Sequence, residues 1–145
     1  KFLYPVYNGV NLVSKFPDRE SNIQIFRLSE MHLIYAEALA NQVGKEKKAR
    51  AALYKNMKRA DTNVAVPTET GQALKDRILL ERRKELAFEG QRLFDLTRSK
   101  KTFTKFRHIA NNITITYPND KTILPIPLDE INGNPNMVGQ QNSGY

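Results

Sequence analysis

The stretch that most constrains the fold covers residues 81–98 and reads ERRKELAFEGQRLFDLTR. Four Arg, one Lys, three Glu and one Asp are mixed in it with five large apolar residues. Charges placed so closely among Leu and Phe cannot all face water once those apolar side chains are buried. The stretch therefore predicts charged side chains that are partly buried and paired with one another.

Three glutamates in this stretch, Glu81, Glu85 and Glu89, recur every four residues and would share one face of a helix. Like charges at that spacing repel by about 0.2–0.5 kcal/mol per pair unless cations lie between them. We predict that Arg77 supplies a cation to Glu81 and that Arg92 supplies one to Glu89. Because an unpaired buried charge is strongly destabilising, such a network would hold a specific geometry.

With 145 residues, the chain is long enough to bury a core, and we expect a single domain over residues 1–145. It contains no Cys, which excludes disulfides and thiolate metal sites. The two histidines, His32 and His108, have no companion ligands at a useful spacing, which argues against a zinc site. We expect neither a metal nor a cofactor.

The net charge of +8 has two interpretations: a solvated basic surface, or a site for a polyanion such as nucleic acid. The positive charges are spread along the chain, and the densest runs are at residues 45–50 and 98–105. We favour the solvated surface and expect no nucleic-acid partner. The chain shows no signal peptide or transmembrane run. We interpret its start without Met as that of a fragment, from which export signals and anchors have been removed.

Two helices are predicted over residues 25–42 and 45–59. Small residues on the first let a neighbouring helix approach closely, and Gly44 is placed to end it as a C-terminal cap. Because only Val43 and Gly44 separate the two helices, they should form an antiparallel hairpin. The predicted apolar faces comprise Leu28, Met31, Leu33, Ile34, Tyr35, Ala38 and Leu39 on the first helix, and Ala49, Ala52, Leu53, Asn56 and Met57 on the second.

A third helix is predicted after a linker at residues 61–67, with Thr68 or Thr70 as its N-terminal cap. It should reach Glu89 and end or bend at Gly90, with another helical turn or two up to Arg98. The helical core thus covers residues 25–98. The predicted apolar stripe of the third helix is Ala73, Leu74, Ile78, Leu79, Leu86 and Phe88.

The flanking segments lack a helical period. Residues 1–21 are predicted to be loop or short extended pieces, and residues 99–145 form an irregular, loop-rich part. Within the latter we expect a short strand at 113–117, an extended ILPIP segment at 123–127 and one helical turn at 128–131. Residues 133–145 are a polar tail with no core pattern.

The three glutamates are also the best candidates for catalytic groups, as the acid and base of a glycosidase. The neighbouring arginines would lower the pKa of each carboxyl, whereas a general acid needs a raised pKa. No nucleophile elbow, phosphate-binding glycine loop or metal-ligand cluster accompanies them. We therefore predict that the chain is not an enzyme.

Tyr4, Tyr7, Tyr117 and Tyr145 lie in the irregular segments. An exposed ring there could stack on the C–H face of a sugar, because binding residues concentrate on loops. The alternative is that these rings cover the core, as aromatic side chains of a small domain mostly do. We favour the core.

Three segments together resemble the C-terminal part of the SusD/RagB family of nutrient-binding lipoproteins of Bacteroidetes. The first is RLSEMHLIYAEA at residues 27–38, and the second is the charged stretch at 81–98. The third, at residues 126–145, contains IPLDEI, NPNM and QQNSGY. All three follow the family's order and spacing.

The resemblance implies a mainly α fold: a helical array with a tetratricopeptide-like helix hairpin, long irregular loops and a C-terminal tail. It also implies that the chain is the C-terminal part of a longer protein, which binds a glycan (an oligo- or polysaccharide) without cleaving it. Such proteins face outward on the cell outer membrane through an N-terminal lipid anchor, which this chain lacks. They deliver their ligand to a SusC-like TonB-dependent transporter.

No ligand-binding residue follows from the resemblance, because ligand contacts in the family come mostly from loops outside the matched segments. Glu37 should pair with an arginine of residues 81–98, since a carboxylate on an apolar helix needs a partner. A tetratricopeptide-like adaptor that binds a peptide or protein is the alternative function, and it predicts at least three stacked repeats. The residues interpreted as fold determinants are Arg27, Glu30, Glu37, Glu85, Glu89, Arg92 and Asp95.

Overall fold

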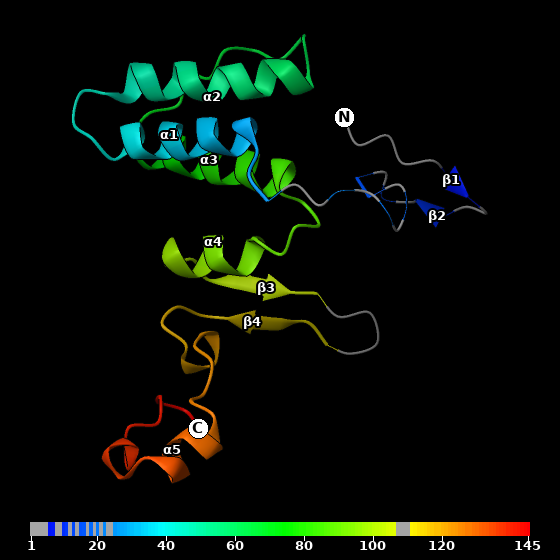
Figure 1. Cartoon of the computed structure of the whole chain (residues 1–145). Coiled ribbons are helices and arrows are strands. Elements are labelled where there is room, and N and C mark those ends of the chain that lie inside the picture. Colours follow the sequence, from blue (N-terminus) through cyan, green and yellow to red (C-terminus); the bar gives the residue numbers. More distant parts are fainter. Residues whose placement is uncertain are drawn as a thin grey trace. The chain divides into compact units, whose positions relative to one another are not determined.

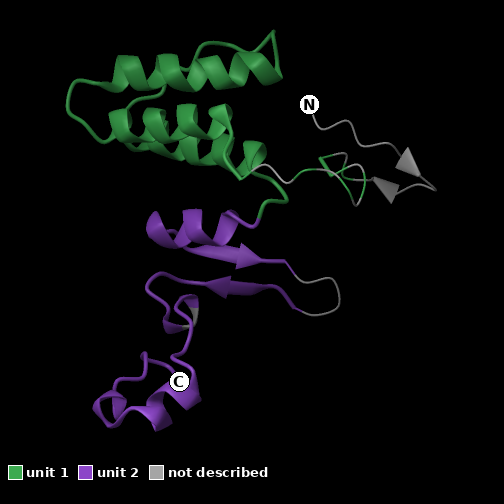
Figure 2. Cartoon of the chain, in the orientation of Figure 1, with its two compact units in different colours: residues 1–89 green, residues 90–145 purple. Residues whose placement is uncertain are grey.

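The structure is a computed structural model of the chain, drawn in Figure 1. It describes residues 6, 7, 10, 11, 13, 15, 16, 18, 20, 22, 25–106 and 111–145. Two compact units, Lys1–Glu89 and Gly90–Tyr145, follow one another along the chain (Figure 2). The single domain expected over residues 1–145 stays a prediction, and each unit is described by itself.

The first unit is built on three helices, α1 (Leu28–Ala40), α2 (Glu46–Ala60) and α3 (Gly71–Glu85). Helices α1 and α2 lie side by side and run in opposite directions, with α3 packed against both (Figure 1). The predicted hairpin is confirmed, and both of its helices lie within three residues of their predicted ends. Gly44 adopts a positive φ of 73°, which a residue without a Cβ tolerates at the turn between them.

The core of this unit lies between the three helices. Its largest fully buried side chains are Leu33, Leu53, Leu74 and Ile78, each with no exposed area. Small residues such as Ala36 and Ala49, also fully buried, let α1 and α2 approach closely. The predicted face of α2 is confirmed, because all five of its residues are buried: Ala49, Ala52, Leu53, Asn56 and Met57.

The predicted apolar face of α1 is only partly buried. Leu33 and Leu39 face the core, but Leu28, Met31, Ile34 and Tyr35 are 42–73% exposed. The reason is that apolar residues lie on more than one side of α1, while α2 and α3 cover only part of it. Periodicity cannot choose between two sides that both carry apolar residues, so the predicted apolar face is broader than the buried one.

Helix α3 begins after Thr70, as one of the two predicted caps requires, but the threonine side chain makes no capping hydrogen bond. The side chain of Glu46, at the start of α2, accepts a hydrogen bond of 2.8 Å from the backbone N–H of Gly71 instead. This carboxylate satisfies one of the free N–H groups at the start of α3 and lies at the positive end of the helix dipole.

Helix α3 ends at Glu85, four residues before the predicted end. A turn follows, in which Phe88 and Gly90 both adopt positive φ angles of 67° and 75°. Phe88 is 58% exposed, so its assignment to the apolar stripe was wrong, while Leu74, Ile78 and Leu86 of that stripe are buried. In the segment before α1, the strands β1 (Val6–Tyr7) and β2 (Val10–Asn11) pair antiparallel, as short extended pieces.

The second unit begins with α4 (Arg92–Arg98), where a further helical turn or two was predicted. Strands β3 (Phe103–Lys105) and β4 (Ile113–Ile115) follow and form an antiparallel hairpin, with Thr104 opposite Thr114. The strand at 113–115 was predicted, but its partner β3 was not. The unit continues with η1 (Asp120–Thr122), α5 (Leu128–Gly133) and η2 (Pro135–Met137).

The polar tail is tied back onto the extended ILPIP segment by side-chain hydrogen bonds. The amide of Gln141 accepts from the N–H of Ile126 at 2.8 Å and donates to its carbonyl at 3.0 Å, as a neighbouring strand would do. The hydroxyl of Tyr145 donates to the carbonyl of Ile123 at 3.0 Å. The tail therefore has a fixed position although it lacks a core pattern. Within the described ranges, no helix is both long and apolar enough to cross a membrane.

Candidate functional site

Glu85, the last residue of α3, lies at the centre of an ion-pair cluster that joins the three helices of the first unit. Arg27, just before α1, donates to Oε1 of Glu85 at 2.7 Å and to Oε1 of Glu89 at 2.6 Å. The hydroxyl of Ser29, in the first turn of α1, donates to the same oxygen of Glu85 at 2.7 Å. Arg59, in the last turn of α2, donates to Oε2 of Glu85 at 2.8 Å. The sequence predicted such a network at this helix end.

The same cluster binds the free carbonyl groups at the end of α3. The ammonium of Lys15 donates to the carbonyl oxygens of Glu85 at 2.9 Å and of Ala87 at 3.0 Å, and it also pairs with Glu89. Nη2 of Arg27 donates to the carbonyl of Glu85 at 2.9 Å. Cations at the negative end of a helix dipole are favourable, and these two satisfy carbonyl groups that the end of α3 leaves free. We call Lys15, Arg27, Ser29, Arg59, Glu85 and Glu89 the Glu85 cluster.

The cluster keeps Glu85 ionised. Burial by itself would raise the pKa of this carboxyl, but the hydrogen bond from Ser29 and the charges of Arg59 and Arg27 outweigh burial. The net effect holds the pKa of Glu85 below its ordinary value of 4.5. A general acid needs the opposite shift, so this carboxyl suits a structural role rather than acid catalysis.

The lowered pKa of Glu85 predicts how stability depends on pH. As the pH falls, the unfolded chain takes up a proton at this carboxyl near pH 4.5, before the folded chain does. The ionised carboxyl of Glu85 therefore stabilises the fold fully above that pH, and this stabilisation is lost below it. Urea unfolding of the wild type and of Glu85→Gln should show a constant difference in free energy near neutral pH. The difference should shrink as the pH falls below about 4.5. A difference that persists unchanged at pH 3 would contradict the assignment.

Other predicted ion pairs also form. Arg77 lies 3.4 Å from Glu81, as predicted, and Lys84 lies 2.7 Å from the same oxygen of Glu81. Arg82 approaches Glu30 at 3.6 Å. These contacts place Glu30 and Glu81 among the residues that fix helix packing.

Asp95 is the buried acid of the second unit, with 3% of its surface exposed, and Arg98 pairs with it at 2.7 Å. Lys15 and Arg27 pair with Glu89 across the first unit, and neither pair was predicted. The suggested pairs Glu89–Arg92 and Glu37 with an arginine of residues 81–98 stay predictions.

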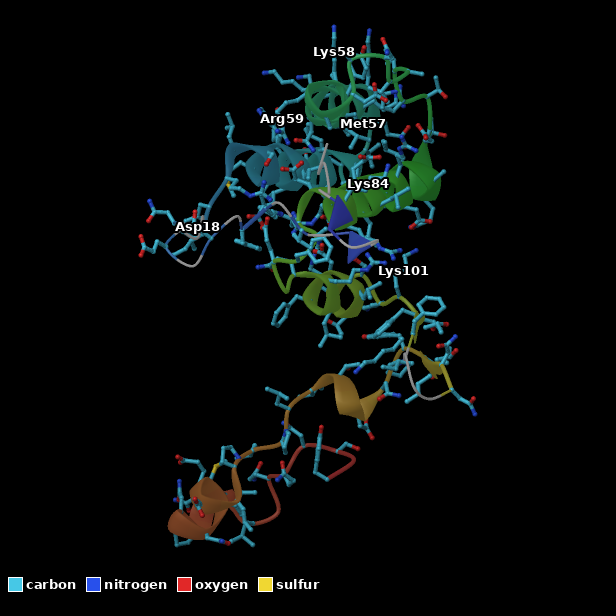
Figure 3. All side chains as sticks on the ribbon, turned by 90° about the vertical axis from the view of Figure 1, so that its right-hand side faces the viewer. Asp18, Met57, Lys58, Arg59, Lys84 and Lys101 are labelled. Carbon is cyan, nitrogen blue, oxygen red and sulfur yellow. The ribbon has the colours of Figure 1, made fainter. Side chains whose placement is uncertain are left out.

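A polar pocket of about 810 Å³ opens beside the Glu85 cluster, where α2 ends and the linker to α3 begins. Asn56 lines it and is only 5% exposed, and no described group forms a hydrogen bond with its Oδ1. A buried acceptor of this kind calls for a donor from water or from a ligand. Arg59 and Lys84, both labelled in Figure 3, line the same pocket together with Asp61 and Asn63. The lining suits a polar ligand with several hydroxyl groups.

A second hollow of about 880 Å³ is lined by residues of α1 and α2 and by Thr62 of the linker. His32 and Tyr35 of α1 form one side, and Tyr54 and three lysines of α2 are on the other. We call this hollow the cationic groove. It is lined by His32, Tyr35, Lys48, Ala51, Ala52, Tyr54, Lys55, Lys58, Arg59 and Thr62.

The tyrosines of the irregular segments and the two histidines are the remaining candidates from the sequence. Tyr117 and Tyr145 are 43% and 52% exposed, so the interpretation that they cover the core was wrong. His32 lines the cationic groove, while Tyr4 and His108 lie outside the described residues, as does the side chain of Tyr7. In the part of the chain that the structure describes, no three His, Asp or Glu residues are grouped as a metal site would need.

Comparison with known proteins identifies the family. The model of the SusD family matches residues 4–145, which is nearly the whole chain. The chain belongs to the SusD family. The three segments that resemble this family thus lie within one continuous match, and the mainly α fold agrees with it.

Named members of the SusD family are similar over most of this chain. The starch-binding protein SusD of Bacteroides thetaiotaomicron is 36% identical over 90% of the chain, and the SusD-like protein P38 of Formosa agariphila is 33% identical over 96%. The chain spans about a quarter of the length of these relatives, 22% of the first and 27% of the second.

Solved structures of the SusD superfamily have the same fold. A protein from Bacteroides vulgatus superposes with a TM-score of 0.73 at 30% identity, covering 96% of this chain and 30% of its own. A protein from Bacteroides fragilis gives a TM-score of 0.72 at 32% identity, covering 86% of this chain. The helical, tetratricopeptide-like fold expected from the sequence is therefore confirmed.

Proposed function

We propose that the chain is part of a SusD-type protein that binds oligo- or polysaccharides at the cell surface without cleaving them. The observation that carries this proposal is the family match over residues 4–145, together with the starch-binding relative. Delivery of the bound glycan to a TonB-dependent transporter of the outer membrane is part of the same proposal. So is attachment to the outer face of that membrane through a lipid anchor.

The chemistry of the described residues supports binding rather than hydrolysis. A glycosidase needs one carboxyl with a raised pKa, whereas cations pair with Glu81, Glu85 and Glu89, and the pKa of Glu85 is lowered. The polar pocket offers amide, carboxylate and guanidinium groups that can form hydrogen bonds with sugar hydroxyls.

The proposal is tested by measuring binding of the protein to a panel of neutral polysaccharides, with release of reducing sugars assayed in the same samples. We expect saturable binding to at least one glycan and no release of product. Release of product that grows with time would overturn the non-catalytic role. The absence of binding to any glycan, neutral or charged, would overturn the glycan-binding role.

A tetratricopeptide-like adaptor is the second candidate, and the exposed apolar side of α1 favours it. Leu28, Met31, Ile34 and Tyr35 could receive the apolar face of a peptide or protein. The adaptor requires at least three stacked repeats, whereas α1 and α2 form a single hairpin. Selective binding of peptides rather than glycans would favour it over the first proposal.

A further inference from the structure

We propose that the cationic groove on α1 and α2 binds the acidic groups, carboxylate or sulfate, of an anionic glycan. The inference rests on the proposed glycan-binding function and adds a charge class and a location to it.

The first observation is a row of lysines along one side of α2. Lys48, Lys55 and Lys58 are seven and three residues apart, so they recur on the same side of the helix. At about 1.5 Å per residue, the row is about 15 Å long. It is therefore long enough to meet more than one acidic group of an extended ligand. Lys58 is exposed, whereas its neighbour Met57 is buried in the core (both labelled in Figure 3).

The second observation is that protein carboxylates do not neutralise this row. All three lysines are exposed, and none forms an ion pair with any described residue. The groove lining contains no Asp or Glu, and of its four cationic side chains only Arg59 is paired with a described residue, Glu85, at 2.8 Å. Elsewhere in the same unit Lys15, Arg27, Arg77 and Lys84 are each paired with a glutamate. The groove therefore offers positive charge that an external anion can bind.

The third observation is that aromatic rings lie among these charges. Tyr35 is 55% exposed, and the ammonium of Lys58 lies 5.9 Å from the centre of the Tyr54 ring. Such rings provide an apolar surface next to a polar one. Ala51 and Ala52, whose side chains are small, line the groove together with the lysines. A pyranose ring that carries an acidic group has the matching features, an apolar C–H face and a charged edge.

An extended acidic peptide fits the groove less well than a glycan does. The groove is made by helices, whose backbone hydrogen bonds are satisfied internally, so it offers no edge that an extended acidic peptide could pair with. Lysine binds carboxylate or sulfate as a compact point charge and does not select between them. The structure thus assigns an acidic glycan, with uronate and sulfate esters as the two sources of the charge.

The test uses glycan pairs that differ only in charge. Oligogalacturonate is compared with its fully methyl-esterified form, and dextran sulfate with dextran of equal length, by calorimetry at two salt concentrations. The groove variant is Lys48→Gln, Lys55→Gln and Lys58→Gln combined. The control variant is Lys45→Gln, Lys47→Gln and Arg83→Gln combined, which removes the same net charge from exposed positions of the same unit outside the groove.

We expect at least one charged member to bind more tightly than its neutral partner, with affinity that falls as salt rises. The groove variant should weaken this binding about tenfold, as three exposed ion pairs would, and the control variant by less than about threefold. A separate Tyr35→Ala substitution, made with all three lysines intact, should also weaken binding of the charged glycan. Circular dichroism and the unfolding midpoint show that each variant is folded.

Several results would overturn the inference. Equal losses in the groove and control variants would show a general effect of net charge. Tighter binding of polyglutamate or of single-stranded DNA, lost in the groove variant, would show that the ligand is not a glycan. Binding of neutral glycans alone would remove the inference and leave the proposed function intact, whereas the absence of any glycan binding would remove both.

Discussion

Replacing Glu85 by Gln should lower the free energy of unfolding by about 3–5 kcal/mol. The amide has almost the shape of the carboxyl, so packing is kept while the charge is lost. Arg27 and Arg59 would then lose the carboxylate that both contact at 2.7 and 2.8 Å, and Arg27 is largely buried. Urea or thermal unfolding at pH 7 measures the change, and Glu85→Ala should have an effect at least as large.

The matched control is Glu20→Gln, which removes one negative charge from an exposed position of the same unit. It should change the free energy of unfolding by less than about 0.5 kcal/mol. A loss below about 0.5 kcal/mol for Glu85→Gln would mean that this carboxyl behaves as a surface ion-pair partner. That result would contradict its central place in the cluster.

Replacing Leu53 by Ala should lower the free energy of unfolding by about 2–5 kcal/mol. Leu53 lies on α2, has no exposed surface and belongs to the core that also contains Leu33, Leu74 and Ile78. The substitution removes buried apolar surface and leaves a cavity that the three helices can fill only in part. Chemical denaturation with an unchanged m-value would measure the loss as a change of stability alone.

Val43→Ala is the control for this core substitution. Val43 is fully exposed in the turn between α1 and α2, so its truncation should cost less than about 0.5 kcal/mol. If Leu53→Ala and Val43→Ala had the same small effect, the described packing of α2 on α1 and α3 would be wrong.

The helices could be predicted because their signals are local. The apolar spacing of Ala49, Leu53 and Met57 marked the buried side of α2, and Gly44 marked the turn before it. The end of α3 was predicted four residues too late, and contacts that stabilise this end are not local. Lys15 and Arg27, 70 and 58 residues before Glu85, bind the carbonyl at which the helix stops. No pattern within residues 81–98 contains that information.

The candidate sites could be predicted only in part for the same reason. The repeat of Glu81, Glu85 and Glu89 indicated an ionic network, but it could not show that Ser29 and Arg59 contribute to it. The cationic groove had a local signal in the lysine spacing at 48, 55 and 58, but these lysines were interpreted only as part of the general basic charge. The part played by Tyr35 and Tyr54 became visible only when α1 and α2 lay side by side.

The Glu85 cluster also bears on how the first unit opens. It connects residue 15, the start of α1, the end of α2 and the end of α3, which are up to 70 positions apart in the chain. These segments all contact the carboxylate of Glu85 or the end of α3. Separating any one of them would therefore disrupt the same buried ion pairs. The amide hydrogens at these ends of α1, α2 and α3 should therefore exchange with solvent as a single cooperative group. Those in the linker at residues 61–67 should exchange independently of that group.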